Sequence, residues 1–345
     1  NQCVGFVASF IDDRYAPGGE RLLEPAAALL GELICDPVTY HGRFVPEYFE
    51  SEKTNLLEAI RSLINDKRDW ADSRLLRALC DGEAYAVPRL GDEETVDKLQ
   101  ALKVYTQYRD LISTAPLEII YSGSAELERV KQALAAAFAT LPREEVRVIS
   151  TAAPHVCRES VQHVEDVLDV TQGKLGMGFS CGSDDMPALL MGNTLFGGSS
   201  NSKLFLNVRE KLSLCYYASS GYHRSKGIIT VSSGIEAQNY EVARREIAAQ
   251  LEAVQNGDFE PWELEGARSC MLSSLRSRED SAGRLEECYL GQAATGLWED
   301  TDALLAQLEA VTPERVAEAA RSIRLDTVYF LSLIHISEPT RLALI

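Results

Sequence analysis

The chain contains 345 residues, of which 46% are apolar and 25% are charged, and its 34 Lys and Arg against 52 Asp and Glu give a formal net charge of −18. This length allows two or three domains with cores of their own, and the composition excludes collagen-like, coiled-coil and wholly disordered chains. An acidic chain repels phosphate backbones and no apolar run reaches the roughly 20 residues that span a bilayer, so we expect neither nucleic-acid binding nor membrane insertion.

The cysteines and the start of the chain bear on the compartment, and the end of the chain bears on the extent of the fold. Eight cysteines are spread along the chain without a C-x-x-C pair, which is typical of reduced thiols in a cytoplasmic protein. The chain begins at Asn1 without a basic or apolar leader, so we expect no signal peptide. Residues 332–345 resemble a translated sequencing adapter, and we expect this tail to lie outside the fold.

Three segments have the spacing of amphipathic helices. Apolar residues follow one helical stripe over residues 56–64 and again over residues 304–311. Thr312 and Pro313 provide an N-cap and a first-turn proline, which predict the start of a further helix. We expect that helix to turn three apolar residues inward, namely Val316, Ala320 and Ile323.

Strand patterns occur between these helices. Residues 174–180 predict one strand, and residues 216–222 and 227–233 predict a pair of strands joined by a polar turn. A further apolar strand is predicted at 325–330. Strands that come first and long helices that follow favour an α+β fold, with helices on one face of a largely antiparallel sheet.

The order of elements repeats once along the chain. Arg74 and Arg284 occupy equivalent positions in two similar helical stretches that lie about 210 residues apart. Residues 114–121 parallel the closing strand at 325–330, which predicts a strand there as well. We therefore divide the chain into the rear part of a first unit, a linker, a complete second unit and the tail, with boundaries at 1–145, 146–159, 160–331 and 332–345.

Common catalytic and nucleotide-binding motifs are absent from the sequence. Neither a P-loop nor a dinucleotide fingerprint fits the glycines between 173 and 178, and no G-x-S-x-G, H-E-x-x-H or H-x-x-E-H occurs. His41, His155 and His223 are isolated in predicted loops, and His163 with Glu165 reads as a surface pair on a strand. The sequence therefore predicts no metal site and no cofactor in this chain.

The segment over residues 195–220 points most directly to a function. Gly197 and Gly198 form a glycine pair that ends one apolar helix, and the serines that follow can cap the next. Arg209 and Tyr216 are seven positions apart, so a helix-to-strand corner would let both face one cleft. Both side chains donate hydrogen bonds, which suits a peptide carbonyl or a developing oxyanion. The alternative places Arg209 in a surface ion pair and Tyr216 in the core.

This segment resembles the second-domain signature of the insulinase (pitrilysin) family of zinc peptidases. The similarity is carried by Gly197-Gly198-x-x-Asn201-Ser202-Lys203-Leu204-Phe205 and Val208-Arg209-Glu210-Lys211-x-x-Leu214-x-Tyr216. The resemblance implies tandem insulinase-type α+β units, each a mainly antiparallel sheet with helices on one face. It also implies that Arg209 and Tyr216 bind substrate over a zinc ion that another unit holds.

An active unit of this family carries H-x-x-E-H and a further glutamate as zinc ligands. The repeat places the first motif mostly before Asn1, so its absence leaves activity undecided. The third-ligand glutamate would lie about where one helix carries four carboxylates, and a solvated helix face explains them equally well. These carboxylates are Glu47, Glu50, Glu52 and Glu58.

Several further stretches resemble one bacterial branch of the family, which is linked to 5-aminopentanol modification of elongation factor P. They include Glu52-Lys53-x-Asn55-Leu56, Ser62-Leu63-Ile64-Asn65-Asp66-Lys67-Arg68, Thr114-Ala115-Pro116 and Gln172-Gly173-Lys174-Leu175. The resemblance implies a non-catalytic subunit that forms a heterodimer with a zinc-bearing homologue and positions a peptide or protein substrate. Two alternatives stay open: an active zinc endopeptidase without its front part, and a structural adaptor with no role in peptide hydrolysis.

Overall fold

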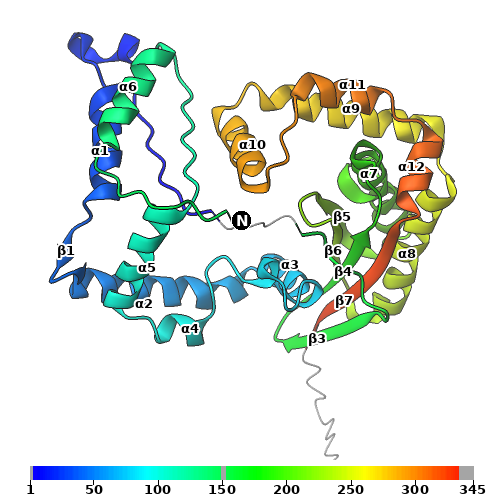
Figure 1. Ribbon diagram of the computed structural model, residues 1–345. Coiled ribbons are helices and arrows are strands. Elements are labelled where there is room, and N and C mark those ends of the chain that lie inside the picture. Colours follow the sequence, from blue (N-terminus) through cyan, green and yellow to red (C-terminus); the bar gives the residue numbers. More distant parts are fainter. Residues whose placement is uncertain (1–2, 149–152, 334–345) are drawn as a thin grey trace, which may run out of the picture. The chain divides into compact units, whose positions relative to one another are not determined.

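The computed structural model describes residues 3–148 and 153–333, coloured along the sequence in Figure 1. Contacts divide these residues into two units. The first contains residues 3–61, 89–148 and 279–298, and the second contains residues 62–88, 153–278 and 299–333. Each unit thus combines segments that are far apart in sequence. The sequence-based boundaries at 1–145, 146–159 and 160–331 describe the internal repeat and stay a prediction. The tail predicted from residue 332 begins too early, because Ser332 and Leu333 belong to the last strand of the second unit. Its other residues, 334–345, lie outside the described residues.

The first unit is mainly helical. Its helices are α1 (Leu23–Cys35), α2 (Pro46–Ser62), α4 (Glu93–Asp97), α5 (Ala101–Thr114), α6 (Leu127–Ala137) and α10 (Ala282–Thr295). In the described part of this unit the strands are β1 (Thr39–Tyr40) and β2 (Arg43–Phe44), which form an antiparallel hairpin.

Helices α1 and α6 pack closely against each other. A side chain at Gly31 would place its Cβ 2.2 Å from the carbonyl oxygen of Ala137, so only glycine allows this approach. The guanidinium of Arg129 on α6 binds both carboxylate oxygens of Glu24 on α1, at 2.7 and 2.6 Å. This bidentate pair fixes the register of the two helices.

The strand predicted at 114–121 is not formed. Helix α5 continues through Thr114, and the extended residues that follow pair with no strand among the described residues. Leu117 and Ile119 in this segment are 47% and 45% exposed. A strand needs a neighbouring chain to accept its backbone hydrogen bonds, and an apolar pattern alone does not provide one.

The second unit contains a five-stranded sheet and its covering helices (Figure 1). The strands are β3 (Gln162–Leu168), β4 (Gly173–Cys181), β5 (Cys215–His223), β6 (Ile228–Ile235) and β7 (Ile323–Leu333). The helices are α3 (Lys67–Leu79), α7 (Met186–Asn193), α8 (Tyr240–Asn256), α9 (Pro261–Arg278), α11 (Thr301–Glu309) and α12 (Pro313–Ala320).

The strand order is β3-β7-β4-β6-β5, and every neighbouring pair is antiparallel except β3 with β7. The predicted strands at 174–180, 216–222, 227–233 and 325–330 are confirmed by β4, β5, β6 and β7. The mainly antiparallel α+β fold is therefore confirmed. Strands β3 and β5 form the two opposite edges of the sheet.

The main core lies between one face of the sheet and the long helices. Leu175, Met177 and Phe179 alternate along β4 and point into this core, as the two-residue period of a strand requires. Ile247 on α8 and Val316 on α12 meet them from the helical layer. Both helices bury their apolar stripe in this core.

Helix α3 packs on the other face of the sheet. Gly176 and Gly178 on β4 point toward this helix, and a Cβ at Gly178 would lie only 2.8 Å from a methyl group of Leu79. Leu75 of α3 is similarly close to Gly176. The glycines thus make room for two fully buried leucines, and the sheet is covered on both faces along β4.

The predicted start of the last helix is confirmed. The hydroxyl of Thr312 accepts a hydrogen bond from the backbone N–H of Arg315, and Pro313 is the first residue of α12. Val316 and Ala320 are buried as expected. The assignment of Ile323 to this helix is wrong, because Ile323 is buried as the first residue of β7.

Candidate functional site

The predicted helix-to-strand corner is present in the second unit. Residues Leu204–Lys211 (η6) are wound as a π-helix, and β5 begins at Cys215. The backbone N–H of Ser213 donates to the carbonyl of Arg209 at 3.1 Å, and Ser213 itself has a φ of 50°. Such left-handed backbone and π-helical turns are uncommon and occur often at functional sites.

Tyr216 is exposed at the beginning of β5. The register between β5 and β6 shifts between Cys215 and Tyr217, so Tyr216 is the extra residue of a β-bulge. Bulges turn a side chain away from the regular alternation of the strand, and Tyr216 is 62% exposed. Its hydroxyl lies 3.4 Å from a carboxylate oxygen of Glu236. The alternative that placed Tyr216 in the core is wrong.

Arg209 lies on the same corner and is partly exposed. Its guanidinium stacks 4.7 Å from the ring centre of Phe205 and lies 3.5 Å from the carboxylate of Glu210. The surface ion pair that we considered for Arg209 is therefore present, and such exposed pairs contribute little to stability. No hydrogen bond or ring contact joins Arg209 to Tyr216 among the described residues. The structure thus places both donors on one corner without bringing them into contact.

The glycine pair supports this corner by close packing. Gly197 is the last residue but one of the π-helical turn Thr194–Gly198 (η5), and a Cβ there would lie 2.7 Å from the hydroxyl oxygen of Ser220 and 2.8 Å from its backbone nitrogen. Gly198 lies against Asn193, whose side chain accepts a 2.8 Å hydrogen bond from Ser220. Glycine at 197 therefore lets the helical turn approach β5 and fixes the strand that carries Tyr216.

Lys203 in the same segment forms a buried ion pair that the sequence did not reveal. Its ammonium group lies 3.1 and 3.4 Å from the two carboxylate oxygens of Glu263 on α9. The two side chains are only 8% and 10% exposed. The predicted serine cap is also present, since Ser202 accepts a hydrogen bond from the N–H of Phe205 at 3.4 Å. The ion pair links the start of η6 to α9, and the serine cap stabilises the first turn of η6 itself.

A second group of charges lies near the end of α3 and the start of β7. Its members are partly or fully buried, and we call it the buried charge network: Glu83, His155, Arg158, Lys226 and Asp326. Asp326 is fully buried, and its carboxylate accepts hydrogen bonds from the backbone and the guanidinium of Arg158, at 2.8 and 2.5 Å. Burial alone would raise the pKa of Asp326, but these bonds and those from Thr327 and His155 outweigh it and lower the pKa.

His155 connects the two carboxylates of the network. Its Nε2 lies 3.3 Å from Asp326 and its Nδ1 lies 2.6 Å from Glu83. Glu83 also contacts the ammonium group of Lys226, which donates to the carbonyl of Ala153 at 2.6 Å. The segment predicted as a linker thus carries a histidine and an arginine that tie α3 to the sheet.

The donor atoms of Cys80, Glu83 and His155 lie within 4.8 Å of one another, so we tested whether they suit a metal ion. The Lys226 ammonium already neutralises Glu83, and both ring nitrogens of His155 face carboxylates. Burial raises the pKa of the Cys80 thiol to about 11, which disfavours the thiolate that a metal requires. These residues therefore suit a network of ion pairs and do not fit a zinc site.

The zinc ligands that the resemblance implies are the H-x-x-E-H motif and one further glutamate. H-x-x-E-H does not occur, and the four glutamates that the resemblance singled out on α2, Glu47, Glu50, Glu52 and Glu58, are all exposed. This is the solvated face that we considered as the alternative. No helix in the described part of the chain has the length and apolar character needed to cross a membrane.

The fold and the corner between η6 and β5 define a peptidase-like domain whose sequence has no metal-binding motif. The family model for "Peptidase M16 inactive domain" matches residues 98–271. The chain belongs to the peptidase M16 family, which confirms the insulinase-type resemblance. It is therefore a homologue of M16 metalloproteases of the inactive-domain type.

One curated relative and two solved structures are similar to this chain. The probable inactive metalloprotease YmfF of Bacillus subtilis is 35% identical over 334 residues, covering 95% of this chain and 78% of the relative. A conserved protein from Enterococcus faecalis has a similar solved structure, with a TM-score of 0.79, 26% identity and coverage of 93% of this chain and 76% of that chain. An M16 inactive domain from Pseudomonas fluorescens shares the fold, with a TM-score of 0.72, 18% identity and coverage of 90% and 74%.

Proposed function

We propose that this chain is a non-catalytic M16 subunit that forms a heterodimer with a zinc-bearing homologue and positions a peptide substrate for it. One observation supports the proposal most directly: a bulge exposes the Tyr216 phenol on the corner that also carries Arg209. The family match to an inactive domain supports the non-catalytic assignment.

In this proposal the chain contributes binding and orientation. The Tyr216 hydroxyl and the Arg209 guanidinium would donate hydrogen bonds to the carbonyl oxygen of the bond to be cleaved. Donors fixed before the reaction stabilise a developing oxyanion without the cost of reorganising solvent. The zinc-bearing homologue would supply the hydrolytic chemistry. This chain's part is to hold the peptide in one orientation.

The resemblance to one bacterial branch leads us to propose a cytoplasmic role in the modification of elongation factor P. This part rests on sequence similarity alone. A structural adaptor would bind the same machinery without touching a peptide bond, so it predicts that Arg209 and Tyr216 are dispensable for turnover. The kinetic experiment below separates the two functions.

The test compares Arg209→Ala and Tyr216→Phe with the unmodified chain in the reconstituted heterodimer. The expected result is a loss in kcat on the order of 100-fold for the double variant, because each removed donor acts on the transition state. Tyr48→Phe is a matched control, since Tyr48 is 65% exposed and lies in the first unit. Arg321→Ala is the matched control for Arg209→Ala, since Arg321 forms a similar exposed ion pair with Glu318.

Heterodimer formation is measured separately by size-exclusion chromatography with light scattering. A heterodimer whose turnover is unchanged in the double variant would exclude the positioning role and favour the adaptor. Peptide hydrolysis by the isolated chain, inhibited by a zinc chelator, would contradict the non-catalytic assignment. Equal losses in the two control variants would show that the effect is not specific to the corner.

A further inference from the structure

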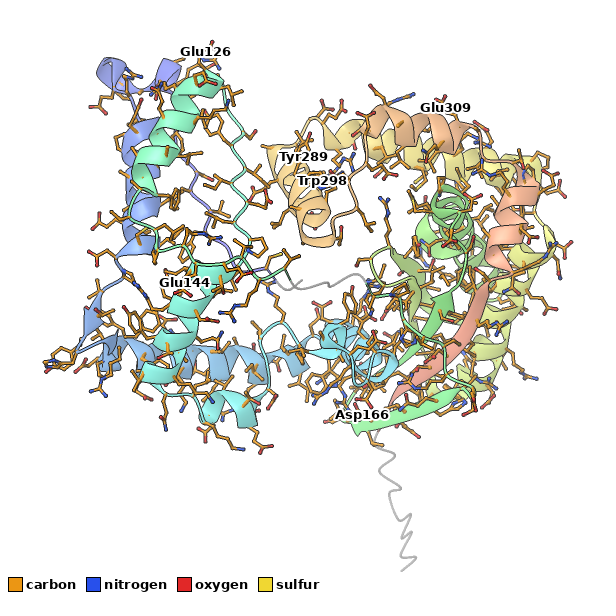
Figure 2. The ribbon with its side chains drawn as sticks, in the orientation of Figure 1. Glu126, Glu144, Asp166, Tyr289, Trp298 and Glu309 are labelled. Atoms are coloured by element: carbon orange, nitrogen blue, oxygen red, sulfur yellow. The ribbon has the colours of Figure 1, made fainter. Side chains whose placement is uncertain are left out.

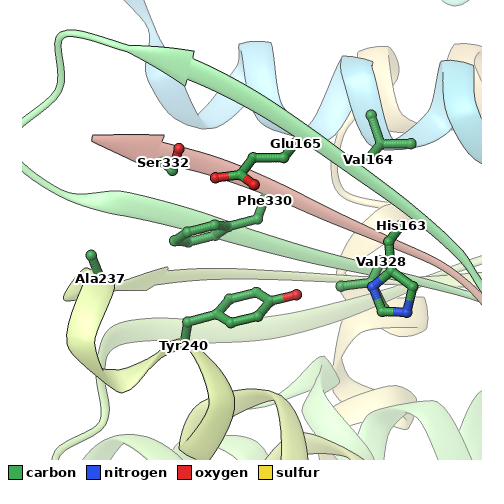
Figure 3. Close-up of a pocket in the computed structure, with 8 residues that line it drawn as sticks. All are labelled: His163, Val164, Glu165, Ala237, Tyr240, Val328, Phe330 and Ser332. Atoms are coloured by element: carbon green, nitrogen blue, oxygen red, sulfur yellow. The ribbon is translucent and has the colours of Figure 1, made fainter. Parts of the chain in front are cut away.

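A hollow of about 490 Å³ opens on the helical face of the sheet, beside the edge strand β3 (Figure 3). His163 and Glu165 of β3 line one side, Phe330 of β7 forms the floor, and Tyr240 closes it at the first turn of α8. Its volume lies in the range of sites that hold small ligands or single side chains. It lies at the edge of the sheet opposite β5, and it is therefore distinct from the corner with Tyr216.

Two aromatic rings form the apolar wall of this hollow. The ring centres of Tyr240 and Phe330 are 4.5 Å apart and their planes are inclined by 41°. Glu165 is the register partner of Phe330 across β3 and β7, so its carboxylate stands above the Phe330 ring (Figure 3). Burial raises the pKa of the Tyr240 phenol; the charge of Arg244 opposes the rise, and the charges of Glu241 and Glu165 add to it. An aromatic wall beside a carboxylate is the usual surrounding of a bound organic cation.

The two acidic residues of β3 differ in their partners. Asp166, labelled in Figure 2, points to the other face, where Arg74 binds it at 2.7 Å and Tyr329 donates to it at 2.9 Å. Glu165 forms no hydrogen bond or ion pair with any described residue. An unpaired carboxylate next to two rings attracts a cation and repels an anion. His163 does not turn the hollow into a metal site, since no group of three metal ligands gathers there among the described residues.

The edge of β3 provides a place for a peptide backbone. In the described part of the chain β3 pairs only with β7, so its other edge has open hydrogen-bonding groups. His163, Glu165 and Val167 are exposed and lie on the same side of this strand. A peptide that joins the sheet as a sixth strand would place every second side chain over this row, and one of them would reach the hollow.

We propose that this hollow binds the Lys or Arg side chain of an extended peptide segment that pairs with the open edge of β3. The ammonium or guanidinium group contacts the faces of Tyr240 and Phe330 and pairs with Glu165. The backbone of the segment continues the sheet. The inference is independent of the proposed role of Arg209 and Tyr216, because it concerns the opposite edge strand and requires no partner subunit.

Fluorescence anisotropy with the full chain tests the side-chain part. The probes are a labelled peptide of alternating Val and Ser with one central Lys, and the same peptide with norleucine at that position. The Lys peptide is expected to bind roughly tenfold more tightly, and Glu165→Gln to abolish the difference. Glu241→Gln is the matched control, because Glu241 neighbours Tyr240 but pairs with Arg244 at 2.9 Å and does not line the hollow.

Two further probes test the strand part. In one peptide the amides of the odd residues are N-methylated, and in the other those of the even residues. Strand addition predicts that one of the two loses binding and the other keeps it. Retained binding by both, or binding of free lysine amide as tight as that of the peptide, would overturn the strand arrangement. Equal affinity of the Lys and norleucine peptides, or no effect of Glu165→Gln, would overturn the cation site.

Discussion

The ion pair between Lys203 and Glu263 leads to a quantitative prediction about the segment that identifies the family. Both side chains are almost completely buried, at 8% and 10% exposure. The variant Lys203→Met keeps the length of the side chain and removes its charge. The carboxylate of Glu263 then stays buried, with the 2.8 Å hydrogen bond from the backbone of Glu260 as its remaining contact.

We expect Lys203→Met to lower the free energy of unfolding of the second unit by about 3 kcal/mol. Removal of one partner from a buried pair typically costs about 3–5 kcal/mol, and the Glu260 N–H places this case at the low end of the range. The double variant Lys203→Met with Glu263→Leu removes both charges. It should return to within about 1 kcal/mol of the original stability, because an apolar pair of similar volume replaces a buried ion pair without penalty.

Urea unfolding followed by tryptophan fluorescence measures this effect. The chain has three tryptophans, and Trp298→Phe leaves only Trp70 and Trp262, both in the second unit. Arg276→Met is the control, because Arg276 and Glu309 form an exposed pair at 3.7 Å whose loss should cost less than about 1 kcal/mol. A loss below about 1 kcal/mol for Lys203→Met, or a double variant as unstable as the single one, would refute the reasoning.

Three further predictions concern packing, the buried charge network and pH. Gly197→Ala should destabilise the chain by about 1–3 kcal/mol, because the added methyl group clashes with β5. Gly291→Ala should stabilise it by about 0.5–1 kcal/mol, because Gly291 lies in α10 with open space around it. Thermal melts that rank the two variants in the opposite order would contradict the packing argument. Asp326→Asn should cost about 3–5 kcal/mol in urea unfolding, and a loss under about 1 kcal/mol would show that the buried charge network is dispensable. Burial lowers the pKa of His223 below its usual 6.5, so the unfolded chain binds its proton more readily and stability should fall as the pH drops below about 6.5. His223→Gln should reduce this slope, and an unchanged slope between pH 8 and pH 5 in urea unfolding would exclude His223 as its source.

Local features of the fold could be predicted from the sequence because they depend on neighbouring residues. Thr312 and Pro313 specify a helix start within one turn, and the structure contains that cap. The apolar runs around 174–180 and 227–233 predicted β4 and β6, since each strand is buried along much of its length. Tyr216 was singled out correctly as a residue of β5, although only the bulge in the structure explains why it is exposed.

Features that depend on distant residues could not be predicted in this way. The pairing of β3 with β7 joins Gln162 to Thr327, and the network joins Glu83 to Asp326 through His155. No local sequence pattern in these segments indicates which distant segment each one contacts. The strand expected at 114–121 failed for the same reason, because its apolar pattern is compatible with a strand but a ladder also requires a neighbour.

Exposed apolar and aromatic side chains are a further property that the sequence pattern alone does not show. Helix α10 has no buried residue, and Tyr289 on it and Trp298 just after it are 49% and 62% exposed (Figure 2). Extended residues near the beginning of the chain, such as Val4 and Val7, are exposed as well. We therefore expect the isolated chain to be poorly soluble, and a soluble monomer with a cooperative melt would contradict this.

Photo-crosslinking tests the central claim, that the exposed phenol on the corner between η6 and β5 contacts the substrate peptide, more directly than any other measurement. Benzoylphenylalanine replaces Tyr216 in one heterodimer preparation and the equally exposed Tyr48 in another, and both are irradiated with a labelled substrate peptide. The account predicts a crosslink from position 216 that excess unlabelled peptide suppresses, and none from position 48. Equal yields from the two positions, or no crosslink from position 216 in a heterodimer that still cleaves the peptide, would contradict it.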